Sequence, residues 1–153
     1  MQKIASFTID HDVLVPGLYI SRVDGDVVTY DLRMRLPNRG DYLSTGAAHT
    51  LEHLFATYVR NSVYSPQVVY VGPMGCRTGF YFLTRDKMTK GEVLALLRDT
   101  FAFIAAYEGE VPGTKQAECG NYLDHDLWQA KKEAAAYKQV LGRLTEDSFT
   151  YPG

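Results

Sequence analysis

The chain has 153 residues and a mass of 17.2 kDa, the size of one domain with a single hydrophobic core. Apolar residues make up 46% and charged residues 22%, which is ordinary for a globular protein and excludes disorder as the main state. Sixteen basic residues face eighteen acidic ones with no block of like charge, so neither a nucleic acid nor an anionic membrane is expected as a partner.

The first part of the chain predicts two strands joined by a tight turn. Residues 17–23 are short and apolar, residues 24–26 read Asp-Gly-Asp, and residues 27–35 alternate with a period of two. In the second strand the apolar side chains share one face, and the other face carries charge, including Arg33. We expect the apolar face to lie in the core.

Helical spacing follows over residues 47–60, where an apolar stripe recurs every three to four positions. Short strands are predicted at 68–71 and 77–84, on either side of a Gly-Pro-Met-Gly turn. A capping box at Thr89 and Glu92 begins a helix that ends by Gly109.

A last amphipathic helix is predicted over about 126–141, and residues 145–153 are expected to be loosely held. Strands, helix, strands and two helices predict an α+β fold, with an antiparallel or mixed sheet and helices packed on it. We expect one domain over residues 1–153.

No apolar run approaches the roughly 20 residues that a membrane helix needs, and the N-terminal residues show no secretory apolar region. A cytoplasmic location is therefore expected. In a reducing compartment the two cysteines are thiols and become candidates for chemistry.

The strongest motif is His49-Thr-Leu-Glu52-His53. Two histidines four residues apart lie on one face of a helix, so both imidazoles can reach one metal ion. Glu52 lies on nearly the same face and can act on a bound water or substrate. This H-x-x-E-H order is that of inverted zinc peptidases. The alternative is an amphipathic helix with surface histidines.

A third metal ligand is expected, and either cysteine could supply it. Cys119 lies beside Gly120 in a loop that can approach a metal closely. Cys76 follows the Gly-Pro-Met-Gly turn, and the neighbouring Arg77 would favour its thiolate as a base or nucleophile. For each cysteine the alternative is an inert, buried thiol.

Five segments together resemble the S-ribosylhomocysteine lyase (LuxS) family, over residues 6 to about 136. They read Ser-Phe-Thr-Ile-Asp-His at 6–11, Asp-Leu-Arg-Met-Arg-Leu-Pro-Asn at 31–38, His-Thr-Leu-Glu-His-Leu at 49–54, Gly-Pro-Met-Gly-Cys-Arg-Thr-Gly-Phe-Tyr at 72–81, and Glu-Cys-Gly-Asn-Tyr-Leu-Asp-His at 118–125. One departure is Tyr70-Val71-Gly72, where many members have Asp-Ile-Ser. It leaves the chemical residues intact but puts polar contacts to the amino-acid end of the substrate in doubt.

The resemblance implies a metal-dependent lyase that cleaves S-ribosylhomocysteine to homocysteine and 4,5-dihydroxy-2,3-pentanedione, the precursor of the autoinducer-2 quorum-sensing signal, within the methyl cycle. It implies a homodimer with active sites at the interface, and one divalent metal per subunit, ferrous iron with zinc or cobalt as substitutes. The implied metal ligands are His49, His53 and Cys119. The implied acid/base groups are Cys76 and Glu52. The substrate-binding residues, supplied by the partner subunit, are Ser6, His11 and Arg33.

Two other functions are considered: a metallopeptidase, and a zinc-stabilised structural module without catalysis. The small size and the second cysteine argue against the peptidase. His125 is interpreted as a helix-end residue outside the metal set, and three aromatic residues, Tyr122, Trp128 and Tyr137, as core or interface side chains.

Overall fold

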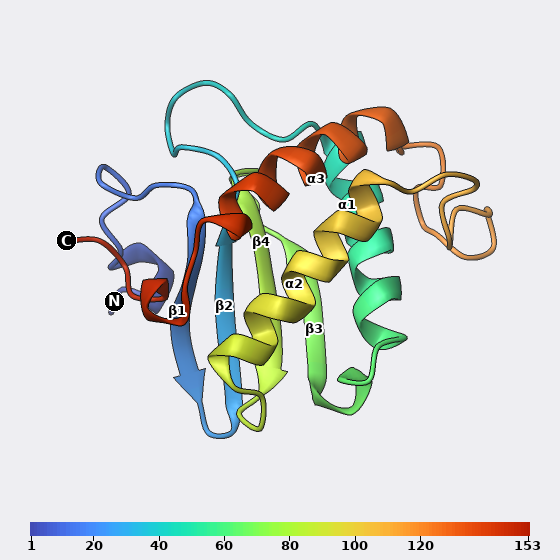
Figure 1. Cartoon of the computed structure of the whole chain (residues 1–153). Coiled ribbons are helices and arrows are strands. Elements are labelled where there is room, and N and C mark those ends of the chain that lie inside the picture. Colours follow the sequence, from blue (N-terminus) through green and yellow to red (C-terminus); the bar gives the residue numbers. More distant parts are fainter.

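A computed structural model describes all residues, 1–153, and contains a four-stranded antiparallel sheet (Figure 1). The strands are β1 (Gly17–Asp24), β2 (Val27–Arg33), β3 (Val68–Pro73) and β4 (Gly79–Arg85). Their order in the sheet is β1-β2-β4-β3, and every neighbouring pair is antiparallel. The α+β prediction is confirmed.

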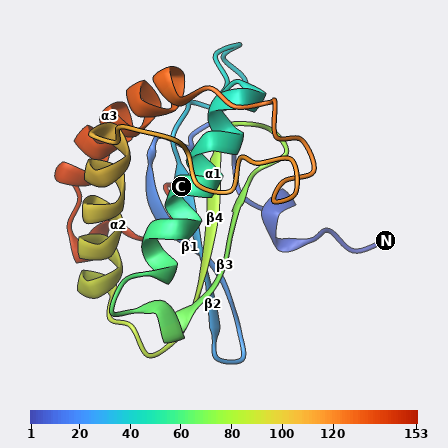
Figure 2. The ribbon, with the colours of Figure 1, turned by 90° about the vertical axis from the view of Figure 1, so that its right-hand side faces the viewer.

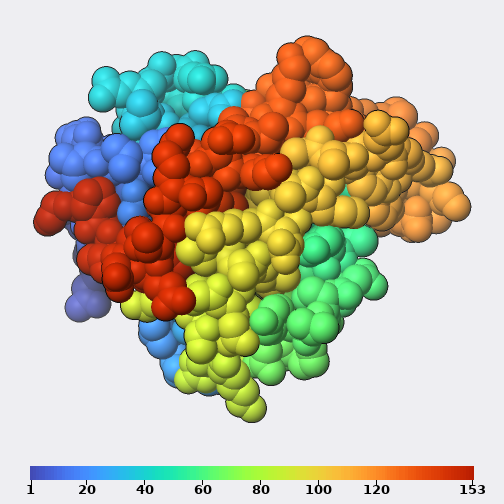
Figure 3. Space-filling model, viewed as in Figure 1, coloured from blue at the N-terminus to red at the C-terminus, as the bar shows by residue number.

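Three helices cover one face of the sheet: α1 (Thr45–Arg60), α2 (Lys90–Ala105) and α3 (Leu127–Gly142). Figure 2 shows the helices on one side of the sheet and the N-terminal segment on the other. In Figure 3, α2, α3 and the C-terminal segment cover most of the sheet. Three short 3-10 turns complete the fold, Ala5–Phe7, Ser65–Gln67 and Glu146–Ser148. No helix has the length and apolar character needed to cross a membrane.

Side-chain caps fix where the helices begin. The predicted capping box is present, because Thr89 Oγ1 accepts from the Glu92 N–H and the Glu92 carboxylate accepts from the Thr89 N–H. Ser44 caps α1, so this helix begins two residues earlier than predicted. Asp126 caps α3 by accepting from the Gln129 N–H.

Aromatic side chains join all three helices to the sheet. Phe55 of α1 lies 5.4 Å, between ring centroids, from both Phe82 of β4 and Phe101 of α2. Tyr137 of α3 packs edge-on against Phe101 at 4.9 Å, and its hydroxyl donates to the Gly17 carbonyl at 2.8 Å. Because these rings are fully or almost fully buried, they hold α1 rigidly against the sheet.

The charged side chains of β2 are buried rather than exposed to solvent. Asp31 is 0% and Arg33 is 2% exposed. The Arg33 guanidinium donates from Nε and Nη2 to the two Asp31 oxygens at 3.1 and 2.6 Å. Burial opposes the charge on Arg33, but these hydrogen bonds and the Asp31 charge outweigh it and raise the pKa of Arg33.

The C-terminal segment is packed, so the expectation of a loosely held tail over 145–153 is wrong. The Phe149 side chain is 3% exposed, and its carbonyl accepts from the Ile20 N–H at 2.8 Å. Tyr151 stacks on Tyr19 with centroids 4.9 Å apart and donates to Asp31 at 2.6 Å. The tail therefore covers the buried Asp31–Arg33 pair.

Candidate metal centre

Helix α1 presents His49 and His53 one turn apart, and backbone carbonyls orient both rings. His49 Nδ1 donates to the Asp124 carbonyl and His53 Nδ1 donates to the Pro112 carbonyl, each at 2.8 Å. Since a carbonyl only accepts, the proton lies on Nδ1 and each Nε2 keeps a lone pair. A second ring nitrogen bonded in this way is typical of metal-ligating histidines.

The loop between α2 and α3 brings a thiol to the two histidines. Cys119 Sγ lies 3.3 Å from His49 Nε2 and 4.0 Å from His53 Nε2. Gly113 in the same loop has φ +75°, and a Cβ there would lie 3.0 Å from His53 Nδ1. Because glycine has no side chain, the loop can approach the His53 ring closely enough for the Pro112 carbonyl to accept from Nδ1.

A third histidine, His125, joins this group. One donor atom from each of His49, His53, Cys119 and His125 lies within 4.8 Å of all the others. The interpretation of His125 as a helix-end residue outside the metal set did not foresee this position; its place six residues after Cys119, just before a helix cap, was the available signal. Burial, followed by the neighbouring His49 and His53, lowers the pKa of His125.

The donor chemistry of this group fits a transition metal. Two imidazole nitrogens and a soft thiolate suit zinc or ferrous iron and disfavour magnesium or calcium. Two independent observations support a metal site. The donor atoms lie close together, and both α1 histidines donate from Nδ1 to a backbone carbonyl. The His/Cys group could therefore hold a metal ion.

Glu52 lies beside this group without belonging to it. Its side chain lines a hollow of about 350 Å³ with His49 and Arg77, and another of about 450 Å³ with His53 and Tyr70. The first lies between α1 and the turn that follows β3, and the second lies between α1, β3 and the loop after α2. The carboxylate is therefore in a position to meet a ligand that enters next to the two histidines.

Cys76 is exposed in the turn between β3 and β4 and is linked to a buried charge. Thr78 Oγ1 accepts from Arg33 Nη1 at 2.8 Å and lies 3.1 Å from Cys76 Sγ. Because the Thr78 hydroxyl accepts from Arg33, its own proton can point to the sulfur. The guanidinium connected to Cys76 is thus that of Arg33, whereas Arg77, with φ +61°, lines the hollow beside Glu52.

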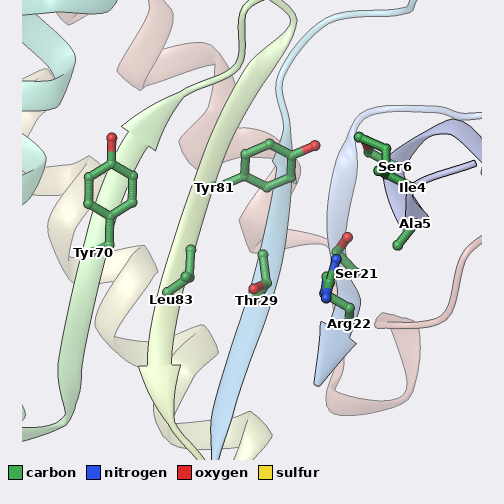
Figure 4. A pocket seen from close by; sticks show the side chains of 9 residues that line it. All are labelled: Ile4, Ala5, Ser6, Ser21, Arg22, Thr29, Tyr70, Tyr81 and Leu83. Carbon is green, nitrogen blue, oxygen red and sulfur yellow. The ribbon is translucent and has the colours of Figure 1, made fainter. Parts of the chain in front are cut away.

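The other two predicted substrate residues lie on different hollows. His11 and Cys76 line the same hollow of about 160 Å³. Ser6 lines another of about 320 Å³ on the uncovered face of the sheet, with Tyr70 and Tyr81 (Figure 4). Within one chain, the structure therefore places Glu52 with the metal-binding group and Cys76 with His11 and Arg33.

Fold and site together define a small α+β domain with a candidate transition-metal centre on one helix and one loop. The model of the S-ribosylhomocysteinase (LuxS) family matches residues 4–147. A protein named S-ribosylhomocysteine lyase from Phocaeicola vulgatus is 49% identical, over 99% of this chain and 98% of its own. Proteins of the same name from Clostridium acetobutylicum and Desulfotalea psychrophila are 46% and 43% identical, over 99% of both chains. The chain belongs to the S-ribosylhomocysteinase family.

Proposed function

We propose that this chain cleaves the thioether of S-ribosylhomocysteine to homocysteine and 4,5-dihydroxy-2,3-pentanedione. The sugar carbonyl must move along the ribose by successive proton shifts until the sulfur lies β to a ketone, and β-elimination then releases the thiol. A bound divalent metal would supply a Lewis acid that stabilises negative charge on a sugar oxygen. Besides family membership, the observation that carries the proposal is the His/Cys donor group beside the Glu52 carboxylate.

The ligands in this proposal are His49, His53 and Cys119. Three protein ligands leave a position open for substrate, which is the arrangement of catalytic metal sites. We take ferrous iron as the metal in the cell, with zinc or cobalt as substitutes, because imidazole and thiolate bind all three. The carbonyl-bonded Nδ1 atoms of both histidines support this ligand set.

Cys76 and Glu52 move the protons in this proposal. The Cys76 thiolate removes a proton from a sugar carbon, and the Glu52 carboxylate carries a proton to or from a sugar oxygen. A hydrogen bond from Thr78 Oγ1 to Cys76 Sγ, at 3.1 Å, would stabilise the thiolate form. Arg33 is buried and bonded to Asp31 and Thr78, which favours an action through Thr78 over direct contact with substrate.

The active enzyme is proposed to be a homodimer, with Ser6 and His11 reaching the metal centre of the partner. Two features support a second copy. Tyr81 and Leu83 line an apolar hollow on the sheet face that no helix covers, and Tyr70 beside them is 53% exposed (Figure 4). The residues proposed to hold substrate and the metal-binding group also lie on separate hollows of one chain.

We place the enzyme in the cytoplasm, in the methyl cycle and in synthesis of the autoinducer-2 precursor. Both cysteines are free thiols, which agrees with a reducing compartment. The proposed reaction places the enzyme in the methyl cycle through its product homocysteine, and in signal synthesis through its product 4,5-dihydroxy-2,3-pentanedione.

Metal content and turnover can be separated with two variants. Cys119→Ala should lose the metal and turnover together, because it removes a ligand. Cys76→Ala should keep one metal per chain, while turnover falls by about 10²- to 10⁴-fold, the usual contribution of a general base. The measurements are metal analysis after desalting, and release of free thiol from S-ribosylhomocysteine by the ferrous protein.

Parental turnover in Cys76→Ala would show that the base is another group. Cleavage of an unfolded protein substrate, without thiol release from S-ribosylhomocysteine, would instead favour the metallopeptidase. If chelation unfolded the chain and no thiol were released, the metal would be structural.

A further inference from the structure

The ring of His125 lies directly against one histidine of the metal-binding group. Its centroid is 3.9 Å from that of His49, and the two planes differ by 25°. One His125 nitrogen lies within 4.8 Å of the donor atoms of His49, His53 and Cys119. By distance alone, His125 would be a fourth ligand that completes a tetrahedral set.

The hydrogen bonds of His125 differ from those of the other two histidines. His49 and His53 both use Nδ1 to donate to a backbone carbonyl, which leaves Nε2 as a lone-pair donor. His125 Nδ1 instead lies 3.0 Å from Thr50 Oγ1, a hydroxyl that can either donate or accept. The direction of this bond decides which His125 nitrogen carries the proton.

The surroundings of Thr50 set that direction. Thr50 is 0% exposed, and its Oγ1 already accepts from the Asp126 N–H at 2.9 Å. His125 Nδ1 is the one acceptor within reach of the Thr50 hydroxyl proton. If Nδ1 carried the proton, both the Thr50 hydroxyl proton and the Nε2 lone pair would lack a partner within the chain, whereas Nδ1 as acceptor leaves only Nε2–H without one. The Thr50 hydroxyl therefore donates to Nδ1. A neutral imidazole that accepts at Nδ1 carries its proton on Nε2.

His125 Nε2 is buried and has no hydrogen-bond partner within the chain. Because that nitrogen carries a hydrogen, it has no lone pair to give to a metal. Asp126, whose N–H fixes the Thr50 hydroxyl, is also the N-cap of α3. The start of α3 thereby fixes the tautomer of the His125 ring.

We propose that His125 is a hydrogen-bond donor that faces the metal centre through Nε2–H, and that it is not a fourth ligand. The proposal rests on the metal site of the proposed function and refines it. It leaves a coordination position open for a substrate oxygen, and Nε2–H becomes a donor for an oxygen held there.

Nitrogen-15 NMR of the zinc-loaded protein tests the tautomer directly. The chain has four histidines, so single-histidine variants assign every ring. We expect His49 and His53 to show Nδ1–H with a zinc-shifted Nε2, and His125 to show Nε2–H with an unprotonated Nδ1. A His125 ring with Nδ1–H and a zinc-shifted Nε2 would make it a ligand and overturn the proposal.

Two pairs of variants complete the test. Thr50→Val should shift the His125 ring partly to Nδ1–H, while Thr50→Ser keeps the hydroxyl and the Nε2–H form. An unchanged tautomer in Thr50→Val would overturn the role given to Thr50.

His125→Phe keeps a flat ring against His49 and should retain one zinc per chain after desalting, whereas His49→Phe should lose it. Loss of zinc from a folded His125→Phe protein would overturn the proposal. None of these measurements depends on turnover, so failure of the parental protein to cleave S-ribosylhomocysteine would refute the proposed function separately.

Discussion

Thr78 connects the buried charge of Arg33 to the exposed sulfur of Cys76. The Thr78 side chain is 2% exposed, and its oxygen accepts from Arg33 Nη1 at 2.8 Å. Thr78→Val keeps the shape but removes both hydrogen bonds. A hydrogen bond to a charged group contributes about 1.5–3 kcal/mol, so alkylation of Cys76 at neutral pH and turnover should each fall about tenfold or more. Mass mapping of the Cys76 peptide during a timed iodoacetamide reaction measures the first effect.

Thr78→Ser is the matched control, because it retains the hydroxyl and should react nearly as the parental protein does. Both variants should keep one metal per chain, since Thr78 does not contact the His/Cys group. If Cys76 reacts at the same rate in Thr78→Val, this hydrogen bond does not stabilise the thiolate.

The chemistry of single residues was predictable where spacing along one element decides it. Two histidines four residues apart on a helix must share a face, and the structure brings them together with Cys119. The direction of a hydrogen bond could not be predicted in this way. The tautomer of His125 and the link from Arg33 to Cys76 depend on Thr50, Thr78 and backbone groups that only the folded chain assembles.

At the scale of elements, the sequence pattern predicted the order and type of the strands and helices. The predicted bounds or exposure differ where contacts with other parts of the chain extend or cover an element. Strand β3 continues to Pro73 because it stays paired with Phe80 of β4 beyond the predicted end. Strand β4 begins at Gly79, two residues later than predicted, since residues 74–77 close a turn with the Arg77 N–H bonded to the Met74 carbonyl. The burial of Asp31 could not be read from β2 alone, because its cover comes from the other end of the chain.

The C-terminal segment should contribute less to the free energy of unfolding at alkaline pH. Burial first, and then the charge of Asp31, raise the pKa of Tyr151 well above its usual value. The folded chain keeps this phenol protonated where the unfolded chain ionises it. Its contribution to stability is therefore complete below about pH 10 and is lost as the pH rises further. We expect the free energy of unfolding to fall steadily above pH 10.

Tyr151→Phe isolates this contribution. At pH 7 it should destabilise the protein by about 1–2 kcal/mol, because Asp31 loses a buried hydrogen-bond donor. Above pH 10 its unfolding free energy should decline less steeply than that of the parental protein. Some decline remains, since burial also raises the pKa of Tyr137 and Tyr81. Urea unfolding curves at pH 7–11.5 give the free energy of unfolding of both proteins. The same decline with pH in both proteins would contradict this prediction.

At the scale of the whole molecule, the residues proposed to act on the substrate lie in separate places on one chain. Glu52 lines two hollows beside α1, one with His49 and the other with His53. His11 and Cys76 share a separate hollow, and Ser6 lies on the uncovered face of the sheet. A closed two-fold dimer gives both copies the same environment, so it would complete two equivalent sites at once. Spacing and periodicity within one sequence cannot place residues of two copies together, and the expectation that they meet came from the family resemblance alone.

Mixing two inactive variants tests this arrangement. Glu52→Gln disables the acid/base group in one chain, and His11→Ala removes a substrate contact in the other. If His11 serves the partner's metal centre, a mixed dimer has one intact site and one doubly altered site. Equal amounts, unfolded together and refolded with metal, form mixed dimers in half of the population, so turnover should recover to about a quarter of the parental value. If both residues serve the same chain, every site in the mixture keeps one defect and turnover stays at the level of the separate variants.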